Sequence, residues 1–272
     1  KNLSTLIVYN HFSKVQIPED ATLILQSMTP WSIFRGLEVS PRTKVLFWSC
    51  YPFGLIPLMP GIRTLMQSTP WFGKLILNTF LFKYKLKMQA FAAHIQHNKG
   101  LVFQDKANLK ITEDYLNIDI QEAEFLTIPS VVSRRKKDDP TAYMKQNKLM
   151  RITWIGRIVD MKFFILKNAI EEMSKLNKEL NYNIVFNIIG RGNYLKRLKR
   201  FCSKKKNLQF NFIDHLHTSN IDDFLISQTD LLFAMGTSAL EGAKLGLPTI
   251  LMDISFKEVP KGYKFTWLHE RK

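Results

Sequence analysis

The feature that most constrains the fold is a strict alternation of strand-like and helix-like segments in the second half of the chain. Apolar, β-rich runs occur at 151–156, 183–190, 208–214, 230–234 and 248–253. Segments with helical periodicity separate them, at 160–180, 193–205, 219–227 and 238–245. Strands that are apolar throughout are typical of parallel sheets that helices cover on both faces. Five such strands predict an α/β fold with a doubly wound sheet.

The first half predicts a second α/β layer of the same kind. Short apolar runs indicate strands at 5–10, 21–26, 44–49, 101–104 and 125–129. A helical stretch at 61–98 is interrupted near "STPWFG". The charged run 133–140 ends in proline and contains no apolar residue, as a surface linker would.

We therefore predict two Rossmann-like domains that face each other across a cleft. The boundaries are an N-terminal domain at 1–132, a linker at 133–149 and a C-terminal domain at 150–272. The chain opens on Lys1 and stops without an obvious closing element, so we expect that either domain could be incomplete. Ligands of such folds bind at the carboxyl ends of the strands.

The charge balance indicates an anionic partner. The 272 residues include 39 Lys and Arg against 23 Asp and Glu, a formal net charge of +16. Nucleic acid, a phosphate-bearing small molecule and an anionic membrane surface all fit this excess. The two cysteines, Cys50 and Cys202, exclude a disulfide framework and favour a reducing cytoplasm. The longest apolar run, 45–62, carries three prolines and does not predict a membrane-spanning helix.

Two turns after strands carry cations. Gly156 and Arg157 end the strand 151–156, and Lys162 follows at the start of a helix, so the two cations suit a diphosphate. A solvated pair is the alternative. After the next strand, Gly190, Arg191 and a second glycine form a Gly-x-Gly turn, which is equally compatible with a tight turn without a ligand. The basic helix behind it is either a solvated face or a contact for anionic lipid headgroups.

Histidines follow the third strand of this half. His215 and His217 lie two apart but lack a third ligand of suitable spacing, so we predict no metal site. The loop that begins at Asp214 and His215 could instead hold a flat base through its backbone amides.

The stretch 235–250 contains the clearest turn from strand to helix. Gly236 allows a close approach of the backbone to a ligand, and Thr237 or Ser238 is expected to cap the next helix. The first-turn amides then favour an anion, with Leu240 nearby. We expect Glu241 in that first turn, either as ordinary helix stabilisation or as a bidentate acceptor for ribose hydroxyls.

Taken in this order and spacing, "GR…K", "IGRG" and "GTSALEGAKLGLPTI" resemble the donor-binding half of group-1, or GT4-like, GT-B glycosyltransferases. The bacterial capsule, O-antigen and lipopolysaccharide sugar transferases belong to this group. The resemblance covers residues 148–255 by motif and the first 130 residues by architecture only. It implies that Arg157 and Lys162 neutralise the diphosphate and that Glu241 holds the ribose. The family's other glutamate, eight residues earlier, is Phe233 here.

The resemblance also implies a reaction. A nucleotide-diphospho-sugar is the donor substrate, no metal or other cofactor is needed, and a sugar or polyprenyl-linked oligosaccharide hydroxyl is the acceptor. On the acceptor side the candidates are His11 and Tyr51. We expect a cytoplasmic enzyme at the inner face of the membrane, because residues 74–91 mix aromatic residues with lysines as an interfacial helix does. A core-packed helix with a charged outer face is the alternative for this segment.

Two other functions stay open from the sequence. A nucleotide-sugar 2-epimerase on the same fold would share the Gly-Ser turn and the following glutamate. A nucleic-acid-binding protein is suggested by charge alone and lacks a recognisable reading motif, so we expect no nucleic-acid partner.

Overall fold

The computed structural model of the chain describes residues 15–26, 37–50, 53–55, 69–128, 146–180 and 182–270. The chain divides into two compact units, Lys1–Ile128 and Pro129–Lys272. The strand expected at 5–10 and the linker residues 133–145 lie outside the described residues.

The C-terminal unit is built on a six-stranded sheet in the order β12-β11-β10-β7-β8-β9. Its strands are β7 (Leu149–Ile155), β8 (Asn183–Ile189), β9 (Gln209–Ile213), β10 (Leu231–Ala234), β11 (Thr249–Leu251) and β12 (Thr266–Trp267). Strands β7 to β11 pair in parallel, and β12 runs antiparallel to β11. Counted along the chain from β7, the parallel order is 3-2-1-4-5, which is the order of a doubly wound sheet. The predicted fold class of this half is confirmed, and only β12 was not expected.

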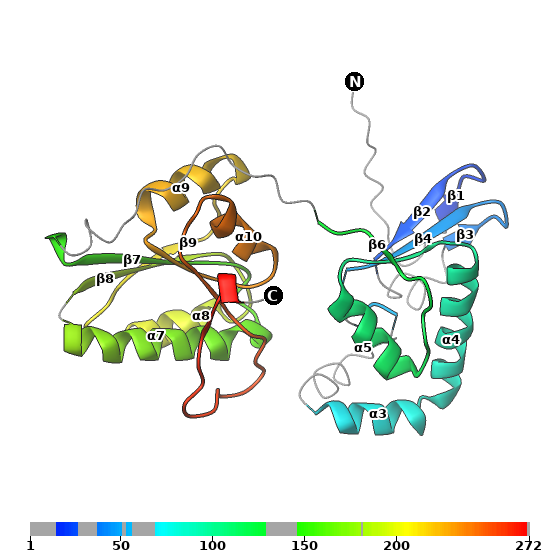
Figure 1. Ribbon diagram of the computed structural model, residues 1–272, viewed down its shortest axis with the longest axis horizontal. Helices are drawn as coiled ribbons and strands as arrows, with labels where there is room; N and C mark the ends of the chain where they lie inside the picture. The colour runs from blue at the N-terminus through cyan, green and yellow to red at the C-terminus, as the bar shows by residue number, and fades with distance from the viewer. Residues whose placement is uncertain are drawn as a thin grey trace. The chain divides into compact units, whose positions relative to one another are not determined.

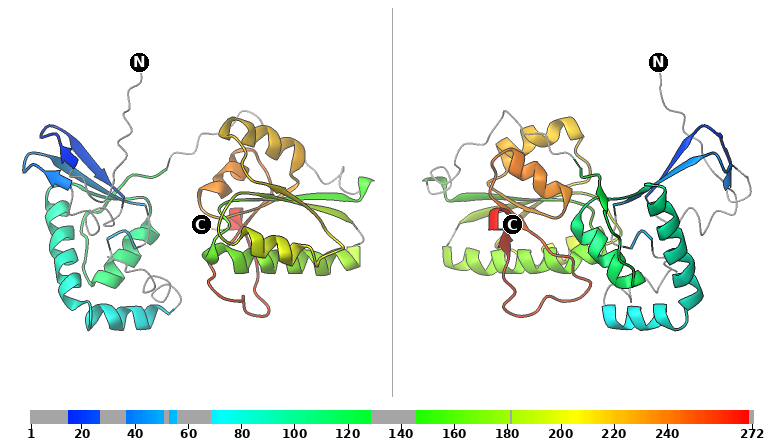
Figure 2. Two further views of the ribbon diagram at one scale, coloured as in Figure 1. Left: turned by 180° about the vertical axis from the view of Figure 1, so that it is seen from behind. Right: turned by 45° about the vertical axis from the view of Figure 1, so that its right-hand side comes forward.

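Helices cover both faces of this sheet. They are α7 (Asp160–Leu180), α8 (Leu195–Cys202), α9 (Ile221–Gln228) and α10 (Thr237–Lys244), with 3₁₀ turns η1 (Thr218–Asn220) and η2 (Leu268–Glu270). Helices α7 and α8 lie on one face, and α9 and α10 on the other (Figures 1 and 2). Both faces are therefore buried, which is why the strands are apolar without alternation.

Two apolar clusters lie on the two sides of the sheet. Trp154, Phe186 and Phe233 are fully buried and pack in the cluster that includes α7 and α8. Leu232 and Ala234, which alternate with Phe233 along β10, pack in the cluster that includes α9 and α10. Burying one such large apolar side chain contributes about 1.5–3 kcal/mol, so this packing sets the register of β10 firmly.

Polar contacts hold β7 against the segment that leads into β10. The Arg151 guanidinium lies 2.7 Å from the carboxylate of Asp230, which is 2% exposed. Asp230 also accepts a hydrogen bond from the Arg151 backbone N–H at 2.9 Å. Close to this pair, the Thr153 and Thr229 hydroxyls lie 2.7 Å apart. Since a buried carboxylate is retained only with such partners, the spacing of these two strands is well determined at their starts.

The N-terminal unit contains a four-stranded parallel sheet in the order β2-β4-β5-β6 and a separate parallel pair, β1 with β3. Its elements are β1 (Val15–Ile17), β2 (Thr22–Leu25), β3 (Leu37–Val39), β4 (Lys44–Ser49), α3 (Pro70–Asn78), α4 (Phe82–His97), β5 (Leu101–Phe103), α5 (Lys106–Leu116) and β6 (Glu124–Phe125). The four-stranded sheet uses the strands expected from 21–26, 44–49, 101–104 and 125–129. Strands β1 and β3 and helix α5 were not predicted.

In the described part of the long helical stretch expected in this unit, residues 69–98, the chain forms two helices. Helix α3 begins at Pro70, with Thr69 as its N-cap residue, which agrees with the interruption expected near "STPWFG". A second break, between Asn78 and Phe82, was not predicted. None of the helices among the described residues is long and apolar enough to cross a bilayer.

Candidate functional site

Two loops of the C-terminal unit meet where the strand order reverses. Strand β7 lies between β8 and β10 in the sheet, and the chain leaves β7 toward β8 but returns to β10. The last residues of the two strands are register partners, Ile155 with Ala234. The loop after β7 and the turn after β10 therefore start side by side at the carboxyl edge. Ligands of doubly wound sheets bind in the crevice at such a switch point.

The loop after β7 is joined to the loop after β8 through their backbones. The N–H of Ile158 donates to the Arg191 carbonyl at 2.8 Å, and that of Tyr194 donates to the Ile158 carbonyl at 3.1 Å. A Cβ added at Gly190 or Gly192 would lie 2.1 Å from the carbonyl oxygen of Gly156 or Ile158, respectively. This close approach accounts for both glycines without a ligand, as the packing alternative supposed.

Arg157 and Lys162 place two cations at the end of β7. Arg157 is exposed, whereas Lys162 is half-buried. The Lys162 Nζ lies 5.8 Å from the centroid of the Trp154 ring, and a Cβ at Gly156 would lie 3.3 Å from that same Nζ. The ammonium group thus folds back over the end of the strand.

The surroundings of Lys162 lower its pKa. Burial lowers the Lys162 pKa, and the positive charge of Arg157 lowers it further. Within the described part of the chain, no acidic side chain forms an ion pair with either cation. A bound anion would relieve both effects, because it offsets the lost hydration and separates the like charges.

Trp154 is a residue that the sequence did not single out. Its side chain is fully buried, and its indole N–H is the buried side-chain donor that has no hydrogen-bond partner among the described residues. The indole edge lies 3.3 Å from a Cβ position at Gly156. The orphaned donor therefore belongs to the floor beneath Gly156 and Lys162. A Trp at an inward position of an apolar strand carries no signal of this in the sequence.

The turn after β10 presents the start of α10 without a side-chain cap. Gly236 is the N-cap residue, with φ 61° and ψ −133°, and no heavy atom lies within 4 Å of a Cβ placed there. The Ser238 hydroxyl donates to the Met235 carbonyl at 2.9 Å and accepts from the Met235 N–H at 3.3 Å. The expectation that Thr237 or Ser238 caps the helix is wrong, since Ser238 closes the turn instead. The helix amides remain available to an anion.

Glu241 lies further along α10 than expected. It is the fifth residue of a helix that begins at Thr237, so it lies in the second turn and the first turn carries no acid. Its carboxylate pairs with Lys244 at 2.5 Å, and Lys244 also pairs with Asp222 at 2.9 Å. Burial alone would lower the Lys244 pKa, but the hydrogen bonds that Lys244 donates to Glu241 and Asp222 outweigh it and raise the pKa. The i, i+3 spacing of Glu241 and Lys244 was a readable signal for this pair.

The remaining donor-side candidates lie around these loops. Leu240 is half-buried on α10, and Arg191 is exposed after β8. Asp214 and His215 are exposed after β9, which is the edge strand. Neighbouring strands lie about 4.8 Å apart, so these two start roughly 10 Å along the edge from the end of β7.

Several other candidates are now accounted for. Phe233 is 0% exposed in β10 and stacks on Phe186 with ring centroids 6.0 Å apart, so this position cannot reach a sugar. His217 accepts a hydrogen bond from the Ser219 N–H and caps η1. The described ranges contain no group of three or more His, Cys, Asp or Glu that could hold a metal ion. His11 and Tyr51 lie outside the described residues.

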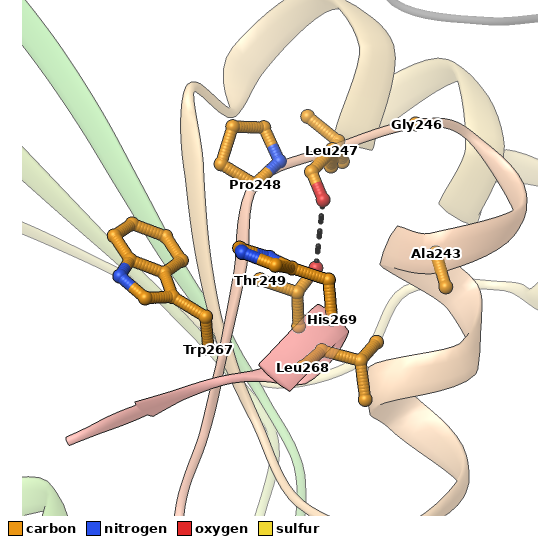
Figure 3. A pocket seen from close by; sticks show the side chains of 8 residues that line it. All are labelled: Ala243, Gly246, Leu247, Pro248, Thr249, Trp267, Leu268 and His269. Atoms are coloured by element: carbon orange, nitrogen blue, oxygen red, sulfur yellow. Dashed lines mark hydrogen bonds between the residues drawn. The ribbon is translucent and has the colours of Figure 1, made fainter. Parts of the chain in front are cut away.

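A pocket of ≈ 610 Å³ opens near the far end of α10 (Figure 3). Its lining is mostly apolar and consists of Ala243, Gly246, Leu247, Pro248, Thr249, Trp267, Leu268 and His269. It lies at the start of β11, where the Thr249 hydroxyl donates to the Leu247 carbonyl at 3.0 Å. None of the candidate residues lines it, so it is not the site that the strand ends form.

Part of the chain that contains these loops is similar to one known family. Residues 136–259 match the family model of glycosyl transferases group 1. This range includes the loop after β7, the turn after β10 and all of α10. No curated protein has significant sequence similarity to the chain.

Solved structures that resemble the chain are distant. A TarM mutant of S. aureus, in complex with fondaparinux, alpha-GlcNAc-glycerol and UDP, has a TM-score of 0.46 and 17% identity over 61% of this chain and 32% of its own. The lipopolysaccharide outer core galactosyltransferase WaaB has a TM-score of 0.41 and 12% identity, and the match covers 56% of this chain and 42% of the WaaB chain. WaaG, a glycosyltransferase involved in lipopolysaccharide biosynthesis, has a TM-score of 0.42 and 11% identity, and the match covers 85% of this chain and 80% of the WaaG chain. The chain thus spans about a third of the TarM chain and less than half of the WaaB chain.

Proposed function

We propose that the chain is a glycosyltransferase, because residues 136–259 match the family model of glycosyl transferases group 1. It would move a sugar from a nucleotide-diphospho-sugar to an acceptor hydroxyl in the synthesis of a bacterial surface polysaccharide. The observation that carries the proposal is the juxtaposition at the switch point. After β7 lie two cations that form no ion pair with any described residue, and a helix start without a side-chain cap follows the neighbouring strand β10.

In this reaction the nucleoside diphosphate is the leaving group. The bond between the anomeric carbon and the phosphate oxygen breaks, and negative charge grows on the diphosphate. Arg157, Lys162 and the amides at the start of α10 are fixed donors of the right sign for that charge. Donors held in place before the reaction stabilise the transition state, because they need no reorganisation as the charge develops. These cations can supply the charge stabilisation without a metal, and we propose a metal-independent transfer.

Glu241 is proposed to bind the ribose hydroxyls. Its side chain is 36% exposed, and its carboxylate is held by Lys244. The ion pair fixes one oxygen and leaves accepting capacity on the carboxylate for a hydroxyl. Gly236, with open space at its Cβ position, lets a sugar or phosphate approach the backbone. Arg191, Asp214 and His215 are proposed to lie around the base.

The acceptor is proposed to be a sugar or a polyprenyl-linked oligosaccharide, with His11 and Tyr51 as the acceptor-side candidates. A polyprenyl-linked acceptor would place the enzyme in the cytoplasm at the inner face of the membrane. The formal net charge of +16 suits both an anionic donor and an anionic surface.

Calorimetry with a panel of nucleoside diphosphates tests the donor site directly. We expect at least one to bind and to stabilise the protein, by about 2.7 kcal/mol at 100 times its dissociation constant. Arg157→Ala and Glu241→Ala should each weaken that binding. The matched controls are Arg200→Ala, an exposed arginine of α8, and Glu179→Ala, an exposed glutamate of α7. If no nucleoside diphosphate binds the folded protein, the proposed function is wrong.

A further inference from the structure

Helices α3 and α4 of the N-terminal unit expose an unusual amount of apolar surface. Five large apolar side chains are each at least 47% exposed: Trp71, Leu75, Phe80, Phe82 and Leu86. Phe80 is 89% exposed. Isolated exposed apolar residues are normal on a protein surface, but a contiguous group marks a binding surface. These five residues are called the α3–α4 surface below.

The positions of these side chains follow from helix geometry. Trp71 and Leu75 are four residues apart on α3, so they share one face of it, and Phe82 and Leu86 share one face of α4 in the same way. Phe80 falls between the end of α3 and the start of α4, and the two helices join at an elbow (Figure 1). The exposed apolar residues are therefore found on both helices and on the turn between them.

The elbow is an ordered element. The Thr79 N–H donates to the Leu75 carbonyl and the Leu81 N–H to the Ile76 carbonyl, both at 3.0 Å. Lys85 is buried and its Nζ donates to the Asn78 side-chain carbonyl at 2.7 Å, which ties α4 back to the end of α3. The exposure of Phe80 is thus imposed by a hydrogen-bonded turn.

Core packing does not explain the exposed residues of α4. Met88, Ala92 and Ile95 form the buried stripe of this helix. Phe82 and Leu86 lie outside that stripe and face solvent. A helix that only packed on the core would carry polar residues at those positions.

The formally charged side chains of the two helices all have one sign. Lys74, Lys83 and Lys87 are exposed on the same two helices. Neither helix contains an acidic residue, and the sequence between Glu38 and Asp105 contains none. Protein interfaces are depleted in lysine at their cores, whereas aromatic and aliphatic residues flanked by lysines match the boundary between acyl chains and anionic headgroups.

We propose that the α3–α4 surface docks the protein on an anionic lipid bilayer. Trp71, Phe80 and Phe82 would enter the headgroup boundary, and Lys74, Lys83 and Lys87 would lie against lipid phosphates and carboxylates. The inference rests on these two helices and does not depend on the proposed sugar transfer. It names a docking surface on the described residues, separate from the basic helix α8.

Sedimentation with vesicles tests it in the absence of any nucleotide or acceptor. We expect the protein to bind vesicles of phosphatidylcholine with phosphatidylserine at low salt, and to bind pure phosphatidylcholine much more weakly. Phe80→Ser with Phe82→Ser should lower binding by about tenfold or more. Lys83→Gln with Lys87→Gln should lower it by about fivefold for each lysine. The melting temperature should stay unchanged, because all four side chains are exposed.

Matched variants separate this surface from others. Leu176→Ser with Leu180→Ser removes two exposed apolar residues from α7, and Lys196→Gln with Lys204→Gln removes two exposed lysines on and after α8. Both should bind vesicles like the unmodified protein. The proposal is overturned if the protein does not bind anionic vesicles. It is also overturned if Lys196→Gln with Lys204→Gln, rather than Lys83→Gln with Lys87→Gln, loses binding. It is also overturned if gel filtration shows that Phe80→Ser with Phe82→Ser dissociates a dimer, because the surface would then bind a second copy of the chain.

Discussion

At the scale of single residues, Arg157 and Lys162 differ in whether their charge can change with pH. An arginine is charged at every accessible pH, whereas a lysine with a lowered pKa can lose its proton in alkaline solution. The Lys162 pKa is lowered first by burial and then by Arg157. In the window between that lowered value and the ordinary 10.5, the unfolded chain binds more protons at this site than the folded protein does. The contribution of Lys162 to the free energy of unfolding therefore rises with pH in this window.

The same shift predicts proton uptake on ligand binding. A nucleoside diphosphate beside Lys162 should raise its pKa, because the anion favours the charged ammonium. In alkaline buffer just below the ordinary lysine pKa, binding should therefore take up a fraction of a proton. Calorimetry in buffers of different ionisation enthalpy measures the number of protons taken up per ligand bound. In Lys162→Arg, which stays charged, uptake should vanish while binding persists. Undiminished uptake in that variant would show that another group titrates.

At the scale of elements, the joined loops after β7 and β8 set the floor of the candidate site. Gly192→Ala would bring a methyl group to 2.1 Å from the Ile158 carbonyl oxygen, so the two loops must separate. We expect a loss of about 2 kcal/mol or more in the free energy of unfolding, together with weaker nucleoside diphosphate binding.

Gly246→Ala is the matched control for this substitution. Gly246 has φ +70° but no heavy atom within 4 Å of its Cβ position, so the change should cost only about 1 kcal/mol, for backbone strain. Urea unfolding of both variants compares the two losses. Equal losses would mean that the close approach of the loops contributes nothing beyond backbone conformation.

The elements of the C-terminal unit were largely predictable from its sequence. Apolar strands and amphipathic helices each carry a local period, and α7 begins and ends where the pattern indicated, at 160 and 180. Strand β12 was missed because two residues show no period. In the N-terminal unit, β1 and β3 are three residues each and α5 follows β5 with little apolar contrast, so the same signals fail there.

The candidate site was predictable in its residue types and less so in its contacts. Positions after strands point to a carboxyl edge, but strand order is a non-local property, so the adjacency of the Arg157 and Gly236 loops needed the structure. The orphaned N–H of Trp154 depends on the packing of the surrounding core. The cap at α10 was misjudged because Ser238 bonds to Met235 rather than to the helix, and sequence alone does not distinguish these two local hydrogen bonds.

At the scale of the whole molecule, the two units have separate apolar cores and separate sheets. All proposed donor-side residues belong to the unit Pro129–Lys272, and the α3–α4 surface belongs to Lys1–Ile128. The two proposed activities, nucleotide binding and membrane docking, should therefore be separable by dividing the chain. A unit with its own core can fold alone.

A fragment of residues 129–272 should bind the nucleoside diphosphate with an affinity close to that of the whole chain. It lacks the α3–α4 surface and should therefore bind anionic vesicles much more weakly than the whole chain does. Circular dichroism with a cooperative thermal transition first establishes that the fragment folds. Calorimetry then compares its dissociation constant with that of the full chain, and sedimentation compares vesicle binding. A folded fragment that binds nucleotide much more weakly would place part of the donor site in the N-terminal unit. Sugar transfer should be lost in either case, because the acceptor-side candidates precede residue 129.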